Sequence, residues 1–162
     1  MFIPHLLEND SLIISDRQFS SRLMLGTGKY QNFQEAKDSI ILSSCEILTV
    51  AIRRAQSSSV DGIDKLLNNL DWAKIWLMPN TAGCQTSEQS IRLAFLGREL
   101  LKNLNYVDNN FLKLEVISDS KYLLPDSLGT ITAAEYLCAK NFDILPYINA
   151  DPILSKQLEE IG

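Results

Sequence analysis

The sequence predicts an α/β fold built around a parallel sheet, and three observations support this. Short apolar segments of strand length alternate along the chain with segments of helical periodicity. This alternation is typical of βαβ units. The centres of the strand-like segments lie about 30 residues apart, which is a normal length for one βα repeat. The length of 162 residues suits a single domain covering residues 1–162.

Each predicted strand ends at a polar or turn-forming residue. The predicted strands cover residues 22–25, 47–52, 75–78, 111–117 and 144–148. The predicted helices cover residues 33–42, 87–104, 128–139 and 153–161. Thr86 or Ser87 provides an N-cap for the second helix, and Gly162 ends the last. Within the N-terminal segment 1–20, residues 11–14 and 18–20 could form a small hairpin.

Five βα units fit two architectures. One is a complete, doubly wound open sheet of the flavodoxin-like kind. The other is the first five βα units of a (β/α)₈ TIM barrel. A barrel takes about 250 residues, so the length alone favours the open sheet.

The composition excludes several classes of function. Fifteen Lys and Arg against twenty Asp and Glu give a net charge of −5, so we expect no basic surface for nucleic acid. No apolar run reaches the roughly 18 residues of a membrane helix, and residues 1–10 do not resemble a secretory signal. Cys45, Cys84 and Cys138 are too far apart for a CxxC pair, so we expect free thiols. With His5 as the single histidine, we expect no metal site.

The segment 111–117 has the most unusual pattern in the chain. Alternation places Leu112, Leu114 and Val116 on one face, and Lys113 and Glu115 on the other. If helices flank this strand, both faces are covered, and a buried lysine is costly unless its chemistry is used. A desolvated amine can attack a carbonyl to form a Schiff base, and Glu115 could hold the charge or move a proton. The alternative is an antiparallel strand that exposes both charges to water.

Polar loops follow other predicted strands, at the edge where parallel sheets bind ligands. Asn80 or Thr81 could hydrogen-bond a substrate, and Arg53-Arg54 could bind an anion. The segment Gly26-Thr27-Gly28-Lys29 lacks the full P-loop pattern, so we expect a structural turn there. Cys84 has no histidine nearby in the sequence, and we expect it to pack in the interior.

Five segments of the chain together resemble the thiazole synthase family, whose members assemble the thiazole phosphate of thiamine. They follow the order of the family and cover nearly the whole chain. The segments are residues 21–30 (SRLMLGTGKY), 46–54 (EILTVAIRR), 78–84 (MPNTAGC), 112–117 (LKLEVI) and 145–152 (LPYINADP).

The resemblance implies a (β/α)₈ TIM barrel, of which this chain holds about the first five βα units. It implies a sulfur-transferring synthase, a transferase that combines 1-deoxy-D-xylulose 5-phosphate, dehydroglycine (2-iminoacetate) and sulfur from a carrier protein with a C-terminal thiocarboxylate. The Schiff-base lysine of the family falls on Lys113, and its active-site glutamate falls on Glu115. No metal or organic cofactor is implied.

The resemblance also implies partners and a location. The partners would be the sulfur-carrier protein, an enzyme that produces dehydroglycine, and further copies of the chain in a homo-oligomer, which is a tetramer in the family. The location would be the bacterial cytoplasm, or the plastid stroma if the protein is plastid-encoded.

The chain departs from the family pattern in three places. Ala150 stands where an acidic residue is common, and residues 56–62 form a short, Ser-rich loop. The family continues past Gly162 into strands that carry phosphate-binding loops and a further catalytic aspartate. We therefore expect these 162 residues to be inactive alone. A Schiff-base aldolase on a similar barrel, or a non-enzymatic flavodoxin-like binding module, remain the alternative interpretations.

Overall fold

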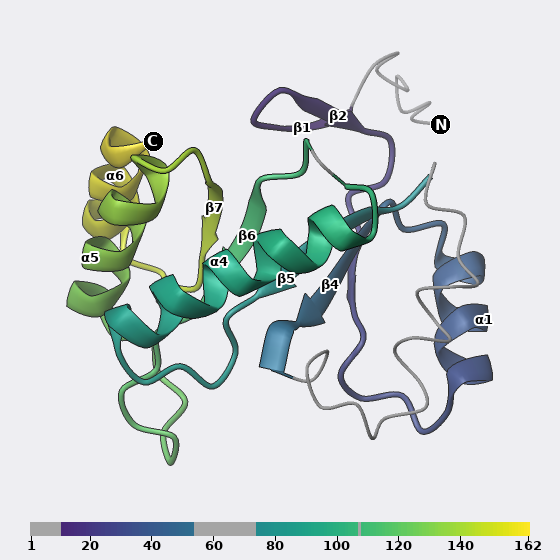
Figure 1. Ribbon diagram of the computed structural model, residues 1–162, viewed down its shortest axis with the longest axis horizontal. Coiled ribbons are helices and arrows are strands. Elements are labelled where there is room, and N and C mark those ends of the chain that lie inside the picture. The colour runs from purple at the N-terminus through teal and green to yellow at the C-terminus, as the bar shows by residue number, and fades with distance from the viewer. Residues whose placement is uncertain (1–10, 54–73, 107) are drawn as a thin grey trace, which may run out of the picture.

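Two sheets and four helices make up the part of the chain that the computed structural model describes, residues 11–53, 74–106 and 108–162 (Figure 1). The smaller sheet is an antiparallel hairpin of β1 (Leu12–Ile14) and β2 (Arg17–Phe19). The five parallel strands of the larger sheet are β3 (Met24–Gly26), β4 (Ile47–Ala51), β5 (Trp76–Asn80), β6 (Phe111–Leu114) and β7 (Asp143–Pro146). The helices are α1 (Phe33–Ser43), α4 (Ser87–Asn103), α5 (Ser127–Cys138) and α6 (Pro152–Ile161). The predicted α/β class, parallel sheet and N-terminal hairpin are confirmed.

The strand order distinguishes between the two architectures that the sequence left open. Each strand of the larger sheet pairs with its neighbour in the chain, in the order β3-β4-β5-β6-β7. A flavodoxin-like sheet has the order 2-1-3-4-5, in which the first strand lies inside the sheet. The flavodoxin-like alternative is therefore wrong for this chain. Consecutive parallel order is the order of strands in a (β/α) barrel.

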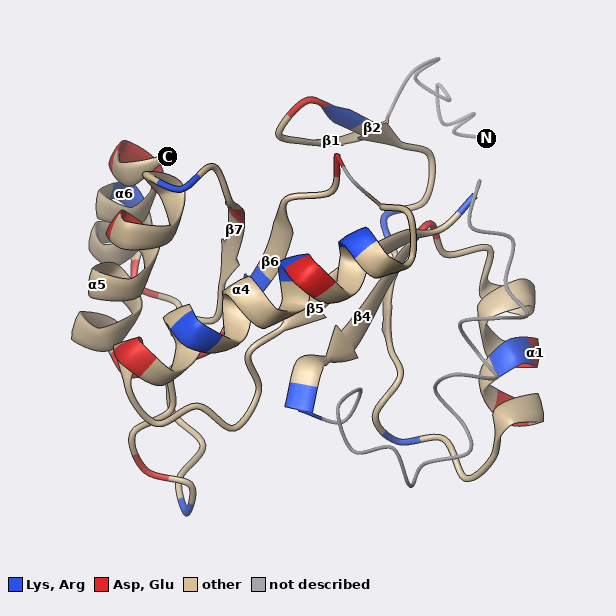
Figure 2. Cartoon of the chain, viewed as in Figure 1, with Lys and Arg blue, Asp and Glu red and all other residues tan. Residues whose placement is uncertain are grey.

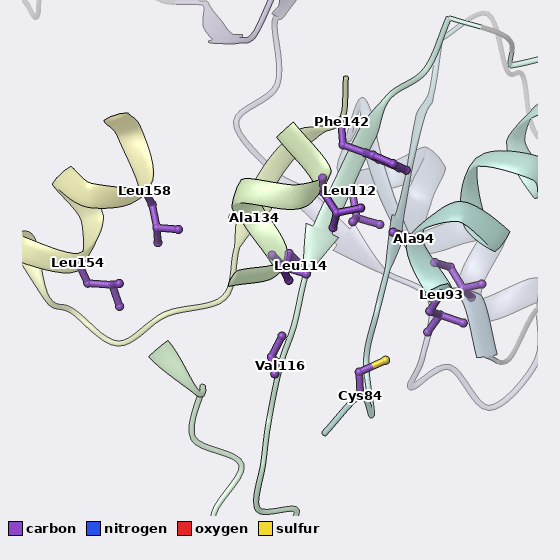
Figure 3. Close-up of a cluster of buried hydrophobic side chains, with 13 residues drawn as sticks. Cys84, Leu93, Ala94, Leu112, Leu114, Val116, Ala134, Phe142, Leu154 and Leu158 are labelled. Atoms are coloured by element: carbon purple, nitrogen blue, oxygen red, sulfur yellow. The ribbon is translucent and has the colours of Figure 1, made fainter. Parts of the chain in front are cut away.

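All four helices cover the same face of the larger sheet. On β4 and β5, the buried side chains that pack with α1 and α4 are Leu48, Val50 and Leu77. On β6, Leu112 and Leu114 pack with residues of α4, α5 and α6, and Val116 continues the same cluster beyond the strand (Figure 3). The prediction that these three residues share one face is confirmed, and that face is the one toward the helices.

The opposite face of the sheet, called the inner face below, is covered at one end by the hairpin. Phe19 of β2 packs against Ile47, Met78 and Phe111. Ile47 and Phe111 are the first residues of β4 and β6, and Met78 is the middle residue of β5. The Ser15 hydroxyl donates to Asp143 Oδ1 at 2.9 Å and ties the hairpin to the last strand. The hairpin leaves the C-terminal ends of the strands uncovered.

Charged residues avoid the centre of the sheet. Strands β4 and β5 contain none, whereas α4 carries both signs (Figure 2). Charges on α4 beside two uncharged strands keep the cost of desolvation low, whereas β6 carries Lys113 and β7 carries Asp143. None of the helices within the described ranges has the length and apolar character needed to span a membrane.

A buried asparagine bridges β5 and β6 where their direct pairing is interrupted. Leu77 and Thr81 both hydrogen-bond toward the β6 side, so Pro79 between them faces β6 as well and has no N–H to donate. The Asn109 side chain donates to the Leu77 carbonyl and accepts from Phe111 N at 3.0 Å. Asn109 is only 2% exposed, and its amide replaces the missing direct bond between the strands.

Two predicted strand boundaries were wrong for reasons of pairing. The sequence predicted that Pro79 follows the end of its strand, but β5 continues through Pro79 to Asn80, because both residues pair with β4 on the other side. The sequence predicted a strand over 111–117, but regular pairing of β6 ends at Leu114. Beyond Leu114, the backbone is held by the Thr81 side chain, which accepts from Glu115 N, and by the turn after β5, where the Cys84 carbonyl accepts from Ile117 N.

We expect Asn109→Ala to lower the free energy of unfolding by about 1–3 kcal/mol, since it leaves a buried carbonyl and a buried N–H without partners. Urea denaturation of the folded protein measures this change. Asn109→Asp is the matched control, because it keeps an acceptor for Phe111 N and removes the donor to Leu77. An Asn109→Ala variant as stable as the parent protein would contradict the bridging role.

Candidate functional site

A lysine and a glutamate form a close ion pair on the inner face. Lys113 Nζ donates to Glu115 Oε1 at 2.7 Å. The two residues are two positions apart on an extended segment, so their side chains point to the same side. The Glu115 side chain is 12% exposed, while the Lys113 side chain is half-buried at 38%. A hydrogen bond between two charged groups is stronger than a neutral one and fixes both side chains.

The ion pair belongs to a polar layer at the C-terminal end of the strands. Asn80, at the end of β5, lies directly opposite Lys113 in the register of the sheet. Its Nδ2 donates to the Thr49 hydroxyl of β4 at 2.8 Å. The layer therefore extends across three neighbouring strands through Thr49, Asn80, Lys113 and the adjoining Glu115. It lies above the apolar residues that the hairpin covers.

A tight turn follows β5 and contacts the segment after β6. The turn closes with a hydrogen bond from Cys84 N to the Thr81 carbonyl at 3.1 Å, and Asn80 Oδ1 accepts from Ala82 N at 3.1 Å. Gly83 has a φ of +85°, a conformation that favours glycine. The Thr81 hydroxyl accepts from Glu115 N at 2.7 Å and donates to the Glu115 carbonyl at 2.9 Å. The turn thus holds the backbone of one member of the ion pair.

Arg53 lies against this turn from the end of β4. Its Nη2 is 3.8 Å from Cys84 Sγ, and a Cβ at Gly83 would lie 3.4 Å from Nη1. Burial raises the pKa of the Cys84 thiol, an effect that the positive charge of Arg53 partly offsets and the Glu115 carboxylate reinforces. Cys84 has no exposed surface and belongs to the core between sheet and helices, so its predicted packing role is confirmed.

The structure brings together four of the residues that the sequence singled out for chemistry or binding: Asn80, Thr81, Lys113 and Glu115. Sequence reasoning missed Thr49. Its signal was available, because Thr49 alternates with Ile47 and so falls on the inner face of β4. Arg54, His5 and the loop 56–62 lie outside the described residues.

The remaining sequence predictions concern the cysteines, the glycine-rich turn and metal ligands. Cys45, Cys84 and Cys138 are free thiols. Thr27 donates both its N–H and its hydroxyl to the Thr49 carbonyl, at 3.2 and 3.1 Å, which ties the turn after β3 to β4. Within the described ranges, no three His, Cys, Asp or Glu side chains gather into a group that could hold a metal ion.

Several curated proteins are similar to this sequence over nearly its whole length. A thiazole synthase of Emiliania huxleyi is 67% identical over 153 residues, which cover 94% of this chain and 55% of that protein. A thiazole synthase of Porphyra purpurea is 57% identical over 162 residues, 99% of this chain and 58% of that protein. In Trichormus variabilis, the matching region, 56% identical, makes up 24% of a protein named bifunctional protein ThiO/ThiG.

A solved structure shares the fold. A chain of the Amycolatopsis orientalis BexX/CysO complex aligns with a TM-score of 0.72 and 27% sequence identity, over 93% of this chain and 59% of that chain. The present chain therefore spans little more than half the length of the thiazole synthases it matches. The family model described as "Thiazole biosynthesis protein ThiG" matches residues 13–162. From this match and these relatives, the chain belongs to the ThiG family of thiazole biosynthesis proteins.

Proposed function

We propose that this chain provides the Schiff-base half of a thiazole synthase. The enzyme would combine 1-deoxy-D-xylulose 5-phosphate, dehydroglycine and sulfur from the thiocarboxylate of a carrier protein. The observation that carries the proposal is the ion pair of Lys113 and Glu115 on the inner face, in a chain of this family. An amine beside a carboxylate, at the C-terminal edge of a parallel sheet, is suited to imine chemistry.

The active form would be a closed (β/α)₈ barrel. Consecutive strand order and helices on one face only are the features that support closure. About three more βα units would close the barrel and enclose the inner face. The additional length of the relatives provides room for them. Barrel enzymes often bind phosphate with loops after their last strands, so the sugar phosphate would need that part of the protein.

In the proposed reaction, the neutral Lys113 amine attacks the ketone carbon of the pentulose phosphate. Water leaves as the carbinolamine collapses to a protonated imine. The imine withdraws electrons and acidifies the neighbouring C–H bonds, which permits the tautomerisations that precede sulfur entry. Glu115, 2.7 Å from the amine, accepts the lysine proton and returns protons in later steps.

Asn80 is the residue that we assign to substrate contact. It lies level with Lys113 in the sheet, and its amide is in the polar layer. Arg53 contributes positive charge at the same edge and could meet the carboxylate-like tail of the carrier protein. Thr81 has no exposed surface, so the predicted substrate contact of Thr81 is not part of this proposal.

The proposed partners follow from the chemistry. The carrier protein, the enzyme that supplies dehydroglycine, and further copies of the chain would assemble around the barrel. Two comparisons support partner association: BexX is found in a complex with CysO, and one relative belongs to a bifunctional protein. We propose the bacterial cytoplasm or the plastid stroma as the compartment.

We expect borohydride to trap the pentulose phosphate on Lys113. The test requires a full-length enzyme, meaning residues 1–162 followed by the rest of the Emiliania huxleyi relative. Peptide mass mapping identifies the modified lysine, and Lys113→Arg, which keeps the charge, should abolish trapping. Labelling of Lys29 or Lys121 in place of Lys113 would contradict the assignment. A trapped imine without any product that depends on the sulfur carrier would indicate the aldolase alternative.

We expect Glu115→Gln in the full-length enzyme to trap substrate normally and to lose thiazole formation by about 10²–10⁴-fold, since loss of one general acid or base has this effect. Single-turnover trapping and steady-state turnover measure the two steps separately. Glu159→Gln, the same substitution at an exposed position of helix α6, is the control. Unchanged turnover in Glu115→Gln would leave Glu115 as a counter-ion for Lys113 only.

We expect residues 1–162 alone to self-associate and to bind the sugar phosphate poorly. Strands β3 and β7 each pair with one neighbour in the described sheet, and unpaired strand edges promote association. Size-exclusion chromatography and substrate titration, each compared with the full-length enzyme, measure these properties. A soluble monomer that unfolds cooperatively would contradict the requirement for barrel closure.

A further inference from the structure

We propose that Thr81 is a positioning residue, whose buried hydroxyl fixes the backbone of Glu115 and so holds its carboxylate at Lys113 Nζ. The proposal rests on the proposed function, in which Lys113 and Glu115 carry the chemistry. It replaces direct substrate contact as the role of Thr81. The argument comes from how the turn after β5 meets the end of β6.

The hydroxyl of Thr81 takes the place of a backbone carbonyl. Thr81 N donates to the Lys113 carbonyl at 3.2 Å and continues the pairing of β5 with β6. In a regular parallel ladder, Glu115 N would then donate to the Thr81 carbonyl. That carbonyl instead accepts from Cys84 N in the turn. The Thr81 hydroxyl provides the acceptor that the turn has removed from the ladder.

The hydroxyl makes two bonds to the same residue. It accepts from Glu115 N at 2.7 Å and donates to the Glu115 carbonyl at 2.9 Å. These two groups belong to the peptide units on either side of the Glu115 Cα. Both backbone torsions of Glu115 are therefore restrained by one side-chain oxygen. A hydroxyl has a single proton, so this donation leaves none for a substrate.

Thr81 contacts the backbone of both members of the ion pair. Its N–H donates to the Lys113 carbonyl, and its hydroxyl hydrogen-bonds the N–H and the carbonyl of Glu115. The direction of each side chain from an extended segment follows from the backbone. Fixing residues 113 and 115 against the same neighbour therefore fixes where the two side chains start and in which direction they leave the backbone, from which Nζ and Oε1 meet at 2.7 Å.

Loss of the hydroxyl should act locally. The segment after Glu115 has anchors of its own, because Ile117 N donates to the Cys84 carbonyl at 2.8 Å and Asp126 N donates to the Val116 carbonyl at 2.8 Å. Thr81 N would keep its bond to Lys113 whatever the side chain. A valine at position 81 has the shape of threonine and removes only the two bonds to Glu115.

The experiment compares Thr81→Val and Thr81→Ser in the full-length enzyme, with Thr130→Val as the matched control. Thr130 is also completely buried, and its Oγ1 has no hydrogen-bond partner among the described residues. Both Thr→Val changes thus replace a buried hydroxyl by a methyl group, but only one removes bonds to Glu115. Turnover, KM, borohydride trapping and thermal unfolding are measured for each variant.

For Thr81→Val, we expect kcat to fall about 10²-fold, with KM and the trapping of Lys113 changed by less than about threefold. This is the expected signature of Glu115→Gln, since both changes impair the same proton transfer. Thr81→Ser and Thr130→Val should keep turnover within about threefold of the parent enzyme. The double variant Thr81→Val/Glu115→Gln should be no more than about threefold slower than Glu115→Gln, because a residue that acts through Glu115 has no effect once Glu115 is removed.

Three results would overturn the proposal. They are normal turnover in a folded Thr81→Val enzyme, failure of Thr81→Ser to restore turnover, and a double variant that loses a further 10²-fold. If Thr81→Val does not fold, Thr81→Cys decides, since a thiol is a weak donor and acceptor. Thr81→Cys should lose about tenfold in kcat, and unchanged turnover would overturn the proposal in the same way.

Failure of the proposed function would look different. If the parent enzyme traps no imine on Lys113, the proposed function fails before Thr81 is considered. Hydrogen exchange at the Glu115 amide then still tests the restraint itself. We expect exchange at least about tenfold faster in Thr81→Val than in Thr81→Ser, and equal exchange in the two variants would overturn it.

Discussion

The handedness of parallel connections is the constraint on which the rest of the structure depends. A connection between neighbouring parallel strands is right-handed in nearly every protein. When each new strand adds to the same edge, as here from β3 to β7, right-handed connections place their helices on the same face, as the described helices α1, α4 and α5 do. The helices then bury one face completely, and the chain must cover the other face by different means.

The inner face meets this requirement in two layers with different chemistry. Near the N-terminal ends of the strands, Ile47, Met78 and Phe111 are covered by the hairpin and form a closed apolar layer. One pair of residues further along each strand, the side chains become polar: Asn80 and Lys113 are in register, and Asn80 hydrogen-bonds Thr49 of β4. The apolar layer lies below the ion pair of Lys113 and Glu115, and charged groups interact more strongly beside an apolar surface than in bulk water. The same alternation along each strand therefore produces both the core and the candidate site.

The sequence was sufficient for the features that depend on local pattern. Periodicity located the strands and helices, and alternation within 111–117 assigned Leu112 and Lys113 to opposite faces. The capping threonine of α4 was also visible, because Thr86 precedes a run of helical periodicity and accepts from Gln89 N. These features need no knowledge of which strands become neighbours.

Features that depend on the register between strands could not be predicted. Asn109 bridges the Leu77 carbonyl and Phe111 N, and this contact exists only once β5 and β6, about thirty residues apart in the chain, lie side by side. The double use of the Thr81 hydroxyl on Glu115 likewise depends on a turn that diverts the Thr81 carbonyl. A threonine in a polar loop gives no sign of such a partner. The same applies to Thr49, whose bond to Asn80 requires β4 and β5 to be aligned.

The bond between Ser15 and Asp143 has a consequence for the order of events during synthesis. It joins residues 128 positions apart, so this contact of the hairpin forms only after β7 has been made. At ribosomal rates of about 5–20 residues per second, this interval is on the order of 10 s. During that time Ile47 and Met78, which are buried in the finished structure, have no cover from β7. For those seconds the apolar cluster around Ile47 and Met78 lacks the side chain of Leu145, which packs against it once β7 has been made.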